Sequence, residues 1–201
     1  MRTTAALILM LSLATLTSPS RAQHASHGAP APSRIDVPSD GLTIPMRDFG
    51  GRPLVEVRID DRGPYAFIFD TGASITVIGE EISRELKLPS PAGVHAQSPG
   101  DGEAPKIVTV NTLHMGHVAV FGLMAAVMPG PALFKGDGAP QGVLSASSFP
   151  GYLVIFDYPG KRITIRKGSL EAADSKTIFQ YGDDQVLPLV PVRIAGHETH
   201  V

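Results

Sequence analysis

One acidic tripeptide constrains this chain more than any other feature. Asp70-Thr71-Gly72 follows an apolar run over residues 65–69 and precedes a second apolar run over residues 75–78. A carboxylate at the end of a buried strand is costly to desolvate unless it is compensated or used. The Thr-Gly pair turns the chain sharply where the strand would otherwise continue. Two interpretations follow: a functional acid on a tight loop, or an aspartate that only caps a turn.

The first 22 residues have the order of a secretory signal. Arg2 precedes an apolar core over residues 5–16, and Ser20-Arg21-Ala22 supplies a cleavage site after Ala22. The apolar core is too short to span a bilayer. We therefore expect a periplasmic or secreted protein with no membrane anchor after cleavage. The remaining chain, about 180 residues, is long enough for one well-packed domain.

Composition narrows the fold class and the partners. The sequence has no cysteine, 21 glycines and 18 prolines, and its apolar runs are short. This pattern favours an all-β domain without disulfides. The formal net charge is −2 and no block of Lys or Arg occurs. Nucleic acid and anionic membranes are therefore not expected as partners.

The pattern along the chain predicts a single lobe over residues 41–168. Residues 23–40 are predicted to be a flexible leader, with regular structure beginning near Leu42, and residues 169–185 a linker. Alternation predicts a half-buried strand at 54–59, and turn residues at 60–64 join it to a strand that ends at Asp70. Further strands are expected near residues 74–78, 107–113, 118–127, 142–144, 152–156 and 162–165, and one helix at residues 80–86.

The tail of the chain repeats part of its head. The seven residues from Pro188 to Ile194 match the seven from Pro53 at six positions. Asp70 lies 17 residues after Pro53 (70 − 53), and the same offset from Pro188 gives position 205 (188 + 17). Two interpretations stay open: residues 186–201 begin a truncated second lobe, or two β-strands merely look alike.

Two parts of the sequence resemble the retropepsin-like aspartic peptidases, the family of single-lobe retroviral proteases and their bacterial relatives. The stronger part is Phe67-Ile68-Phe69-Asp70-Thr71-Gly72-Ala73-Ser74, and the other is Gly142-Val143-Leu144 followed by residues 154–158. The resemblance extends from about residue 42 to residue 166. It implies a closed, mostly antiparallel β-barrel with one short helix. One position departs from the family: Ser145 stands where a glycine is usual.

The resemblance also implies an aspartic-type endopeptidase. Asp70 would supply one carboxylate of a catalytic pair, Thr71 would brace the loop, and Gly72 would let the backbone approach the attacking water. The second Asp-Thr-Gly loop would come from a homodimer partner or a missing second lobe. Two carboxylates a few ångströms apart share one proton and titrate as a pair, so one can activate water while the other polarises the peptide carbonyl. No metal or other cofactor is required.

The implied substrate is a peptide or protein that binds as an extended strand. Ala73 and Ser74 would contact it beside the acid. Pro99, Gly100 and Gly102 belong to a polar loop that would form a flap over it. The alternative function is a non-catalytic retropepsin-like module that binds peptides or partner proteins with half of a catalytic pair.

Other polar motifs have simpler interpretations. Three His-x-x-His pairs occur, and they are His24/His27, His114/His117 and His197/His200. No third ligand accompanies any of them, and residues i and i+3 of a strand point to opposite faces, so no metal site is predicted. Asp157 lies in a Tyr-Pro-Gly context and is predicted to be a turn residue.

Overall fold

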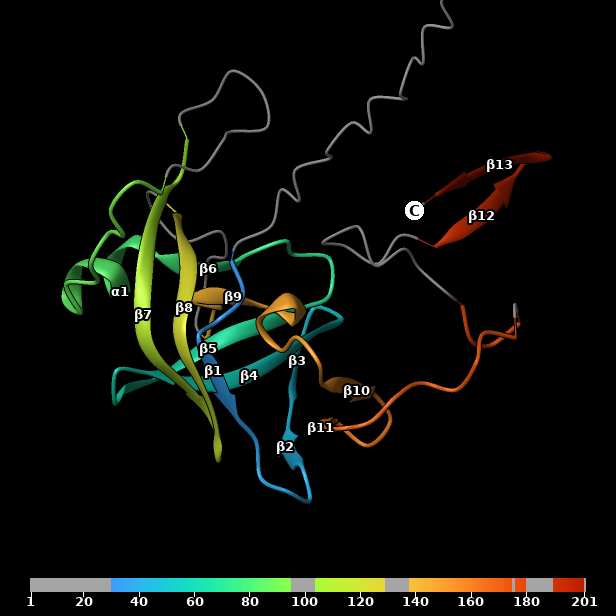
Figure 1. The fold of residues 1–201 in the computed structure, drawn as a ribbon, viewed down its shortest axis with the longest axis horizontal. Coiled ribbons are helices and arrows are strands. Elements are labelled where there is room, and N and C mark those ends of the chain that lie inside the picture. The colour runs from blue at the N-terminus through green and yellow to red at the C-terminus, as the bar shows by residue number, and fades with distance from the viewer. Residues whose placement is uncertain (1–29, 95–103, 129–137, 175, 180–189, 201) are drawn as a thin grey trace, which may run out of the picture.

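A ring of six hydrogen-bonded strands forms the centre of the protein (Figure 1). In order around the ring the strands are β4 (Arg52–Ile59), β5 (Arg62–Asp70), β9 (Gly142–Ser145), β6 (Thr76–Gly79), β8 (Val118–Met128) and β7 (Lys106–Met115), which returns to β4. The computed structural model describes residues 30–94, 104–128, 138–174, 176–179 and 190–200. The predicted signal segment at residues 1–22 lies outside these ranges.

The ring is a mostly antiparallel barrel, and the predicted all-β fold class is confirmed. Only the β5–β9 and β6–β8 pairs are parallel. Helical structure in the described ranges comprises the short α1 (Glu80–Glu85) and the 3₁₀ turn η1 (Ala146–Ser148). None of these helical residues belongs to a helix with the length and hydropathy of a transmembrane span.

The other strands extend the barrel or stand beside it. β1 (Arg34–Asp36) pairs with β8, and β3 (Arg47–Phe49) pairs with β4. A separate three-stranded sheet has the order β10 (Leu153–Asp157), β11 (Arg162–Arg166) and β2 (Leu42–Pro45). A two-stranded hairpin comprises β12 (Pro191–Ile194) and β13 (His197–His200).

Regular structure begins earlier than the sequence predicts. β1 lies inside the segment 23–40 that we expected to be a flexible leader. Three residues leave too short a pattern to identify a strand, and the pairing that defines it comes from β8, more than 80 residues later: Ser33 Oγ donates to the Phe121 carbonyl at 2.9 Å. The Arg34 guanidinium lies 3.9 Å from the centre of the Phe121 ring, which adds a cation–π contact.

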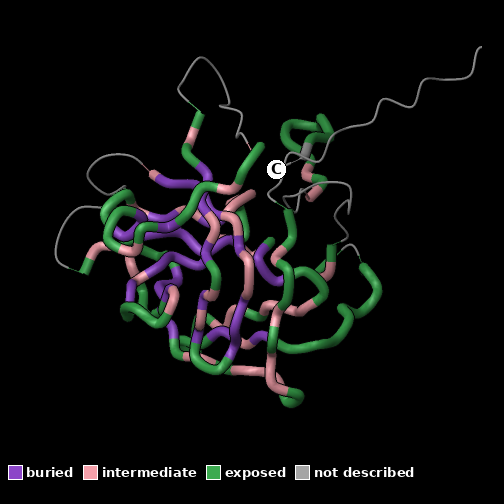
Figure 2. Tube along the Cα trace, turned by 60° about the vertical axis from the view of Figure 1, so that its left-hand side comes forward, coloured by how far each residue is buried: buried purple, intermediate pink, exposed green. Residues whose placement is uncertain are grey.

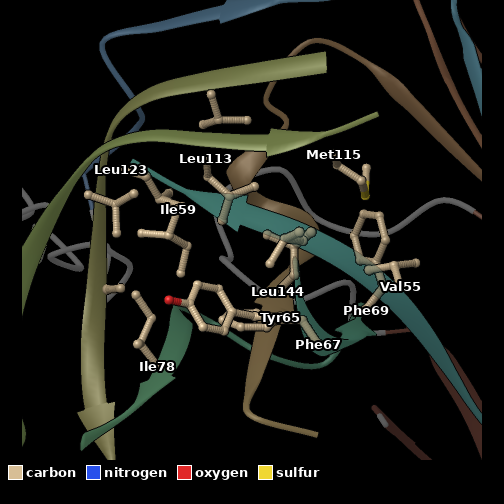
Figure 3. Packing of buried hydrophobic residues seen from close by; sticks show 14 of the residues in the cluster. Val55, Ile59, Tyr65, Phe67, Phe69, Ile78, Leu113, Met115, Leu123 and Leu144 are labelled. Atoms are coloured by element: carbon tan, nitrogen blue, oxygen red, sulfur yellow. The ribbon is translucent and has the colours of Figure 1, made fainter. Parts of the chain in front are cut away.

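The hydrophobic core fills the interior of the barrel. Figure 2 shows the buried residues concentrated along the barrel strands. In Figure 3, side chains from opposite walls, such as Leu113 and Leu144, point toward one another, with Phe67 beside them. All three have no exposed surface. Each side chain of this size contributes about 1.5–3 kcal/mol when it is fully buried, so these contacts hold the barrel walls together.

β9 lies between two strands, and its first residue, Gly142, has no room for a side chain. A Cβ at Gly142 would lie 2.5 Å from the Phe67 ring and 2.6 Å from the Val77 carbonyl oxygen. β9 is parallel to β5 on one side and antiparallel to β6 on the other. These two flanking strands are the ones that the Asp70 loop connects, so β9 closes the base of that loop.

Helix α1 follows the loop strand β6 directly. Ile82 is buried among the core residues and Leu88, just beyond the helix, is buried as well, while Leu86 packs partly against the core. Glu80 and Glu81 lie in the first turn and Arg84 in the last, which suits the helix dipole.

Candidate active site

Asp70 is the last residue of β5, and the residue before it is anchored in the core. Phe69 is buried with 2% of its surface exposed. Its ring lies 5.5 Å from that of Phe149 and 5.3 Å from that of Phe156, the latter edge-on. Aromatic pairs at such distances and tilts are favourable beyond their burial. Because successive side chains of a strand alternate between faces, the anchored Phe69 directs Asp70 away from the core.

The Asp70 carboxylate is half-buried and has one hydrogen bond within the described residues. The Gly72 N–H donates to Asp70 Oδ1 at 2.7 Å. A Cβ at Gly72 would lie 3.3 Å from the same oxygen, closer than an ordinary contact. Glycine therefore allows the loop to fold back onto its own acid. Asp70 forms no ion pair with the described cations.

The next three predicted site residues differ in exposure. Thr71 is exposed, and its hydroxyl has no hydrogen-bond partner in the described parts of the chain. Ala73 and Ser74 are half-buried. The Ala73 carbonyl oxygen accepts a hydrogen bond from the hydroxyl of Ser145, the last residue of β9, and the Ser74 carbonyl oxygen lies 3.5 Å from Ser147 Oγ in η1. This part of the loop is therefore held through its backbone, and the side chains of Thr71, Ala73 and Ser74 are not used to hold it.

Serine and threonine hydroxyls beneath the loop form a cluster that the sequence analysis did not identify. Thr76 Oγ1 and Ser148 Oγ lie 2.9 Å apart, and the Ser145 N–H donates to Thr76 Oγ1 at 3.1 Å. All three residues are buried. Buried hydroxyls need hydrogen-bond partners, and these partners lie about 70 residues apart in sequence. No local pattern could have revealed these pairs. The one signal in the sequence was Ser145, which stands where the family usually has a glycine.

Three of the predicted substrate-binding residues cannot be placed. Pro99, Gly100 and Gly102 lie outside the described residues, as does the rest of the loop expected to form the flap. The other five predicted site residues are described, and they lie together on one loop: Asp70, Thr71, Gly72, Ala73 and Ser74.

The other acids and histidines occupy separate positions. Asp157 ends β10, and its carboxylate serves the turn that follows, in line with the predicted turn role: it accepts a hydrogen bond from the Gly160 N–H at 2.8 Å and pairs with Arg162 at 2.7 Å. His114 lies on β7, and its Nε2 is 4.0 Å from the exposed Asp61 carboxylate. Within the described ranges, no three His, Cys, Asp or Glu side chains form a group that could hold a metal ion.

A family model matches the part of the chain that contains this loop. Residues 55–147 match the model described as aspartyl protease. The match includes the Asp70 loop and β9, and it confirms the resemblance to retropepsin-like aspartic peptidases that the sequence predicts. No curated protein matches the sequence.

Solved structures with related folds have low sequence identity to this chain. A retropepsin-like aspartic protease from Rickettsia conorii is 14% identical with a TM-score of 0.48, and the match covers 67% of this chain and 92% of that one. Basic 7S globulin from soybean is 15% identical with a TM-score of 0.34, covering 71% and 47%. Conglutin gamma, a basic 7S globulin from lupine seeds, is 14% identical with a TM-score of 0.36, covering 65% and 42%. The match therefore spans less than half of either globulin chain.

Proposed function

From the aspartyl protease match and the geometry of the Asp70 loop, we propose that this chain is an aspartic-type endopeptidase. The supporting observation is the position of the Asp70 carboxylate at the end of a buried strand. The Gly72 N–H orients Oδ1, while Oδ2 has no hydrogen-bond partner among the described residues. A half-exposed carboxylate with one free oxygen is suited to hold a water molecule and a second carboxyl group.

The reaction needs two such carboxyl groups that share one proton. The ionised carboxylate takes a proton from the water as the water oxygen bonds to the peptide carbonyl carbon. The protonated carboxyl gives its proton to the carbonyl oxygen. When the C–N bond of the tetrahedral intermediate breaks, a proton passes to the leaving nitrogen. Asp70 supplies one carboxyl group, Gly72 orients it, and the exposed Thr71 hydroxyl braces the opposing loop.

The substrate in this proposal is a peptide bound as an extended strand. Ala73 and Ser74 lie next to the acid on the same loop. The Ala73 carbonyl oxygen accepts the Ser145 hydroxyl proton, so the side chains and N–H groups of Ala73 and Ser74 are the parts that would contact substrate. Pro99, Gly100 and Gly102 complete the proposed binding residues from the flap side.

The second carboxyl group would come from a homodimer partner or from a second lobe. The tail hairpin supports the second source. Ala195 and Gly196 form a two-residue turn with φ values of 51° and 86°, and the Asp60-Asp61 turn between β4 and β5 has φ values of 46° and 65°. In both hairpins the isoleucine before the turn pairs with the residue after it. The repeated segment thus has the same turn as well as similar residues.

Asp70→Asn tests the enzymatic proposal. We expect the purified wild-type chain to cleave an unfolded polypeptide at acidic pH, and a hydroxyl-containing transition-state analogue to inhibit it. Asp70→Asn should abolish cleavage because amide nitrogen cannot accept the proton from water. Asp48→Asn is the matched control, because Asp48 Oδ1 also accepts a glycine N–H in a turn, from Gly51 at 2.9 Å. Equal activity of wild type and Asp70→Asn would refute the proposal.

The oligomeric state separates the two sources of the second acid. If the chain is active as a homodimer, sedimentation should detect a dimer, and mixing with excess Asp70→Asn should inhibit wild type by forming mixed dimers. A monomer that becomes active only when the coding sequence is extended beyond Val201 would favour the second lobe. A monomer that binds peptides without cleaving them would favour the non-catalytic module.

We also propose that the protein is exported to the periplasm or medium after cleavage behind Ala22. The arrangement of Arg2, the apolar core and Ser20-Arg21-Ala22 supports this. N-terminal sequencing of the protein from its native host tests it, with Gln23 expected as the first residue. A chain that retains residues 1–22 would contradict it.

A further inference from the structure

Ser145 occupies the position directly beside Asp70 in the barrel. The two residues are register partners in the parallel β5–β9 pair. Ser145 has no exposed surface, and its neighbours in β9 are apolar. A hydroxyl in such a place is unfavourable unless its hydrogen bonds are satisfied. The hydrogen bonds of Ser145 therefore indicate what it does.

The single hydroxyl proton of Ser145 goes to the Asp70 loop. Ser145 Oγ donates to the Ala73 carbonyl oxygen at 2.5 Å. A serine hydroxyl has one proton and two lone pairs. Its 2.6 Å contact with Ser147 Oγ must therefore be donated by Ser147, and the Ser147 N–H donates to the same oxygen at 3.1 Å. Ser145 Oγ therefore donates one hydrogen bond, to Ala73, and accepts two, both from Ser147.

The backbone of Ser145 holds the other end of the same loop. Its N–H donates to Thr76 Oγ1 at 3.1 Å, and Thr76 Oγ1 also contacts Ser148 Oγ at 2.9 Å. Ala73 and Thr76 flank the turn that returns the chain from Asp70 to β6. One buried residue therefore fastens both sides of this turn.

We infer that Ser145 is a positioning residue for the Asp70 loop. By fixing the Ala73 carbonyl it limits rotation of the peptide groups next to Gly72, whose N–H orients the Asp70 carboxylate at 2.7 Å. The glycine that the family usually has at this position offers no hydroxyl, so this fastening is a property of the present chain. The catalytic consequence rests on the proposed function, whereas the fastening itself does not.

Ser145 also caps η1 by accepting the Ser147 N–H, and the test must separate that role from positioning. Ser145→Ala and Ser145→Gly remove the hydroxyl but keep the N–H that bonds Thr76. Ser83→Ala is the control, because Ser83 is a buried serine on α1, away from the loop. Amide hydrogen exchange measured by NMR under native conditions reports on the loop whether or not the protein is an enzyme.

We expect residues 71–76 to exchange about 3- to 10-fold faster in both Ser145 variants, the range for loss of one net hydrogen bond. Ser83→Ala should leave them unchanged. A capping role alone would accelerate only the Ser147 amide. Unchanged loop exchange in both Ser145 variants, or acceleration confined to Ser147, would overturn the inference.

If either variant fails to fold, Ser147→Ala is measured instead. It keeps the Ser145 hydroxyl but removes one donor, so a smaller acceleration is expected, and no acceleration would again overturn the inference.

Kinetics gives the second readout. Because Asp70 would act in the chemical step, Ser145→Gly should lower kcat about 3- to 10-fold and leave KM unchanged. A wild-type kcat in Ser145→Gly would overturn the catalytic part of the inference. If wild-type protein shows no cleavage at all, the proposed function fails, while the exchange experiment still decides whether Ser145 positions the loop.

Discussion

Two hairpins that begin with nearly the same seven residues have different environments in this protein. In β4, Val55, Val57 and Ile59 are buried with at most 1% of their surface exposed. In β12, Ile194, which corresponds to Ile59, is 61% exposed. β4 also pairs with β3 and β7, whereas β12 pairs only with β13 among the described strands. Local sequence therefore suffices to specify a hairpin, and burial depends on which other strands are available.

One substitution between the repeats accounts for part of the difference. Asp60 Oδ1 accepts the Thr112 N–H at 2.8 Å and Oδ2 accepts Asn111 Nδ2 at 3.1 Å, so the first turn is attached to β7. The second turn has Ala195 at the corresponding position, and alanine has no polar side-chain group. The two turns share a conformation, but only the first carries the side chain that joins it to a neighbouring strand.

The largest expected difference between the two hairpins concerns the free energy of unfolding when the equivalent isoleucines are truncated. Ile59→Ala should lower the free energy of unfolding by about 2–5 kcal/mol, because it leaves a cavity in a fully buried site. Ile194→Ala should change it by less than about 0.5 kcal/mol, as exposed positions do. Urea denaturation of both variants measures the difference. Similar losses for the two would mean that the tail hairpin is packed as tightly as the barrel.

The glycine at the start of β9 should have the next largest effect. Gly142→Ala forces the new methyl group against the Phe67 ring and the Val77 carbonyl, which should destabilise the barrel by about 1–3 kcal/mol. Gly196→Ala in the tail meets no atom within 4 Å but has a φ of +86°. It should weaken only the β12–β13 hairpin, as seen in NMR chemical shifts, and leave the barrel's unfolding midpoint unchanged. A stable Gly142→Ala barrel would contradict the close packing of β9.

The turn substitution should have a smaller effect. Asp60→Asn keeps a side chain that tolerates positive φ but replaces one acceptor oxygen with a donor that faces Asn111. We expect a loss of about 0.5–1.5 kcal/mol. Ala195→Asn in the tail should be neutral within about 0.5 kcal/mol. Chemical denaturation tests both, and a neutral Asp60→Asn would show that β7 does not depend on this turn.

The smallest effect is expected from pH and should concern the barrel alone. Burial raises the pKa of the Tyr65 phenol, the Glu85 carboxylate raises it further, and Arg62 opposes them. Below about pH 10, the ordinary tyrosine value, the phenol is neutral in both states. Above it the unfolded chain ionises first, so the free energy of unfolding should fall as pH rises. Tyr65→Phe should reduce that slope. Residues 190–200 contain no tyrosine, so the tail hairpin should not contribute to this slope.

The sequence predicts well what is encoded by neighbouring residues. The β4–β5 hairpin, helix α1 and the turn at Asp157 all follow from alternation, apolar spacing and turn residues, and the structure confirms them. The helix ends at Glu85, one residue before the predicted boundary. The acidic loop was identified for the same reason, because its signal lies within one continuous segment.

The remaining features depend on residues that are distant in sequence. The parallel pairing of β5 with β9 and the contacts of Ser145 join positions more than 70 residues apart. A family resemblance indicated that residues 142–145 matter, but it implied a glycine where the hydroxyl of Ser145 now makes the decisive contact. Pairing of β1 with β8 had no local signal, since a three-residue strand has no measurable period.

The insertion of β9 between β5 and β6 has a consequence for the order of events during synthesis. Ser145 follows Asp70 by 75 residues (145 − 70), so a nascent chain contains the acid long before it contains the strand that holds it. Contacts between distant residues also form late because closing a long loop costs entropy. The acidic loop therefore reaches its final shape only when the barrel is nearly complete, and an unfinished chain leaving the ribosome carries the acid without the strand that holds its loop.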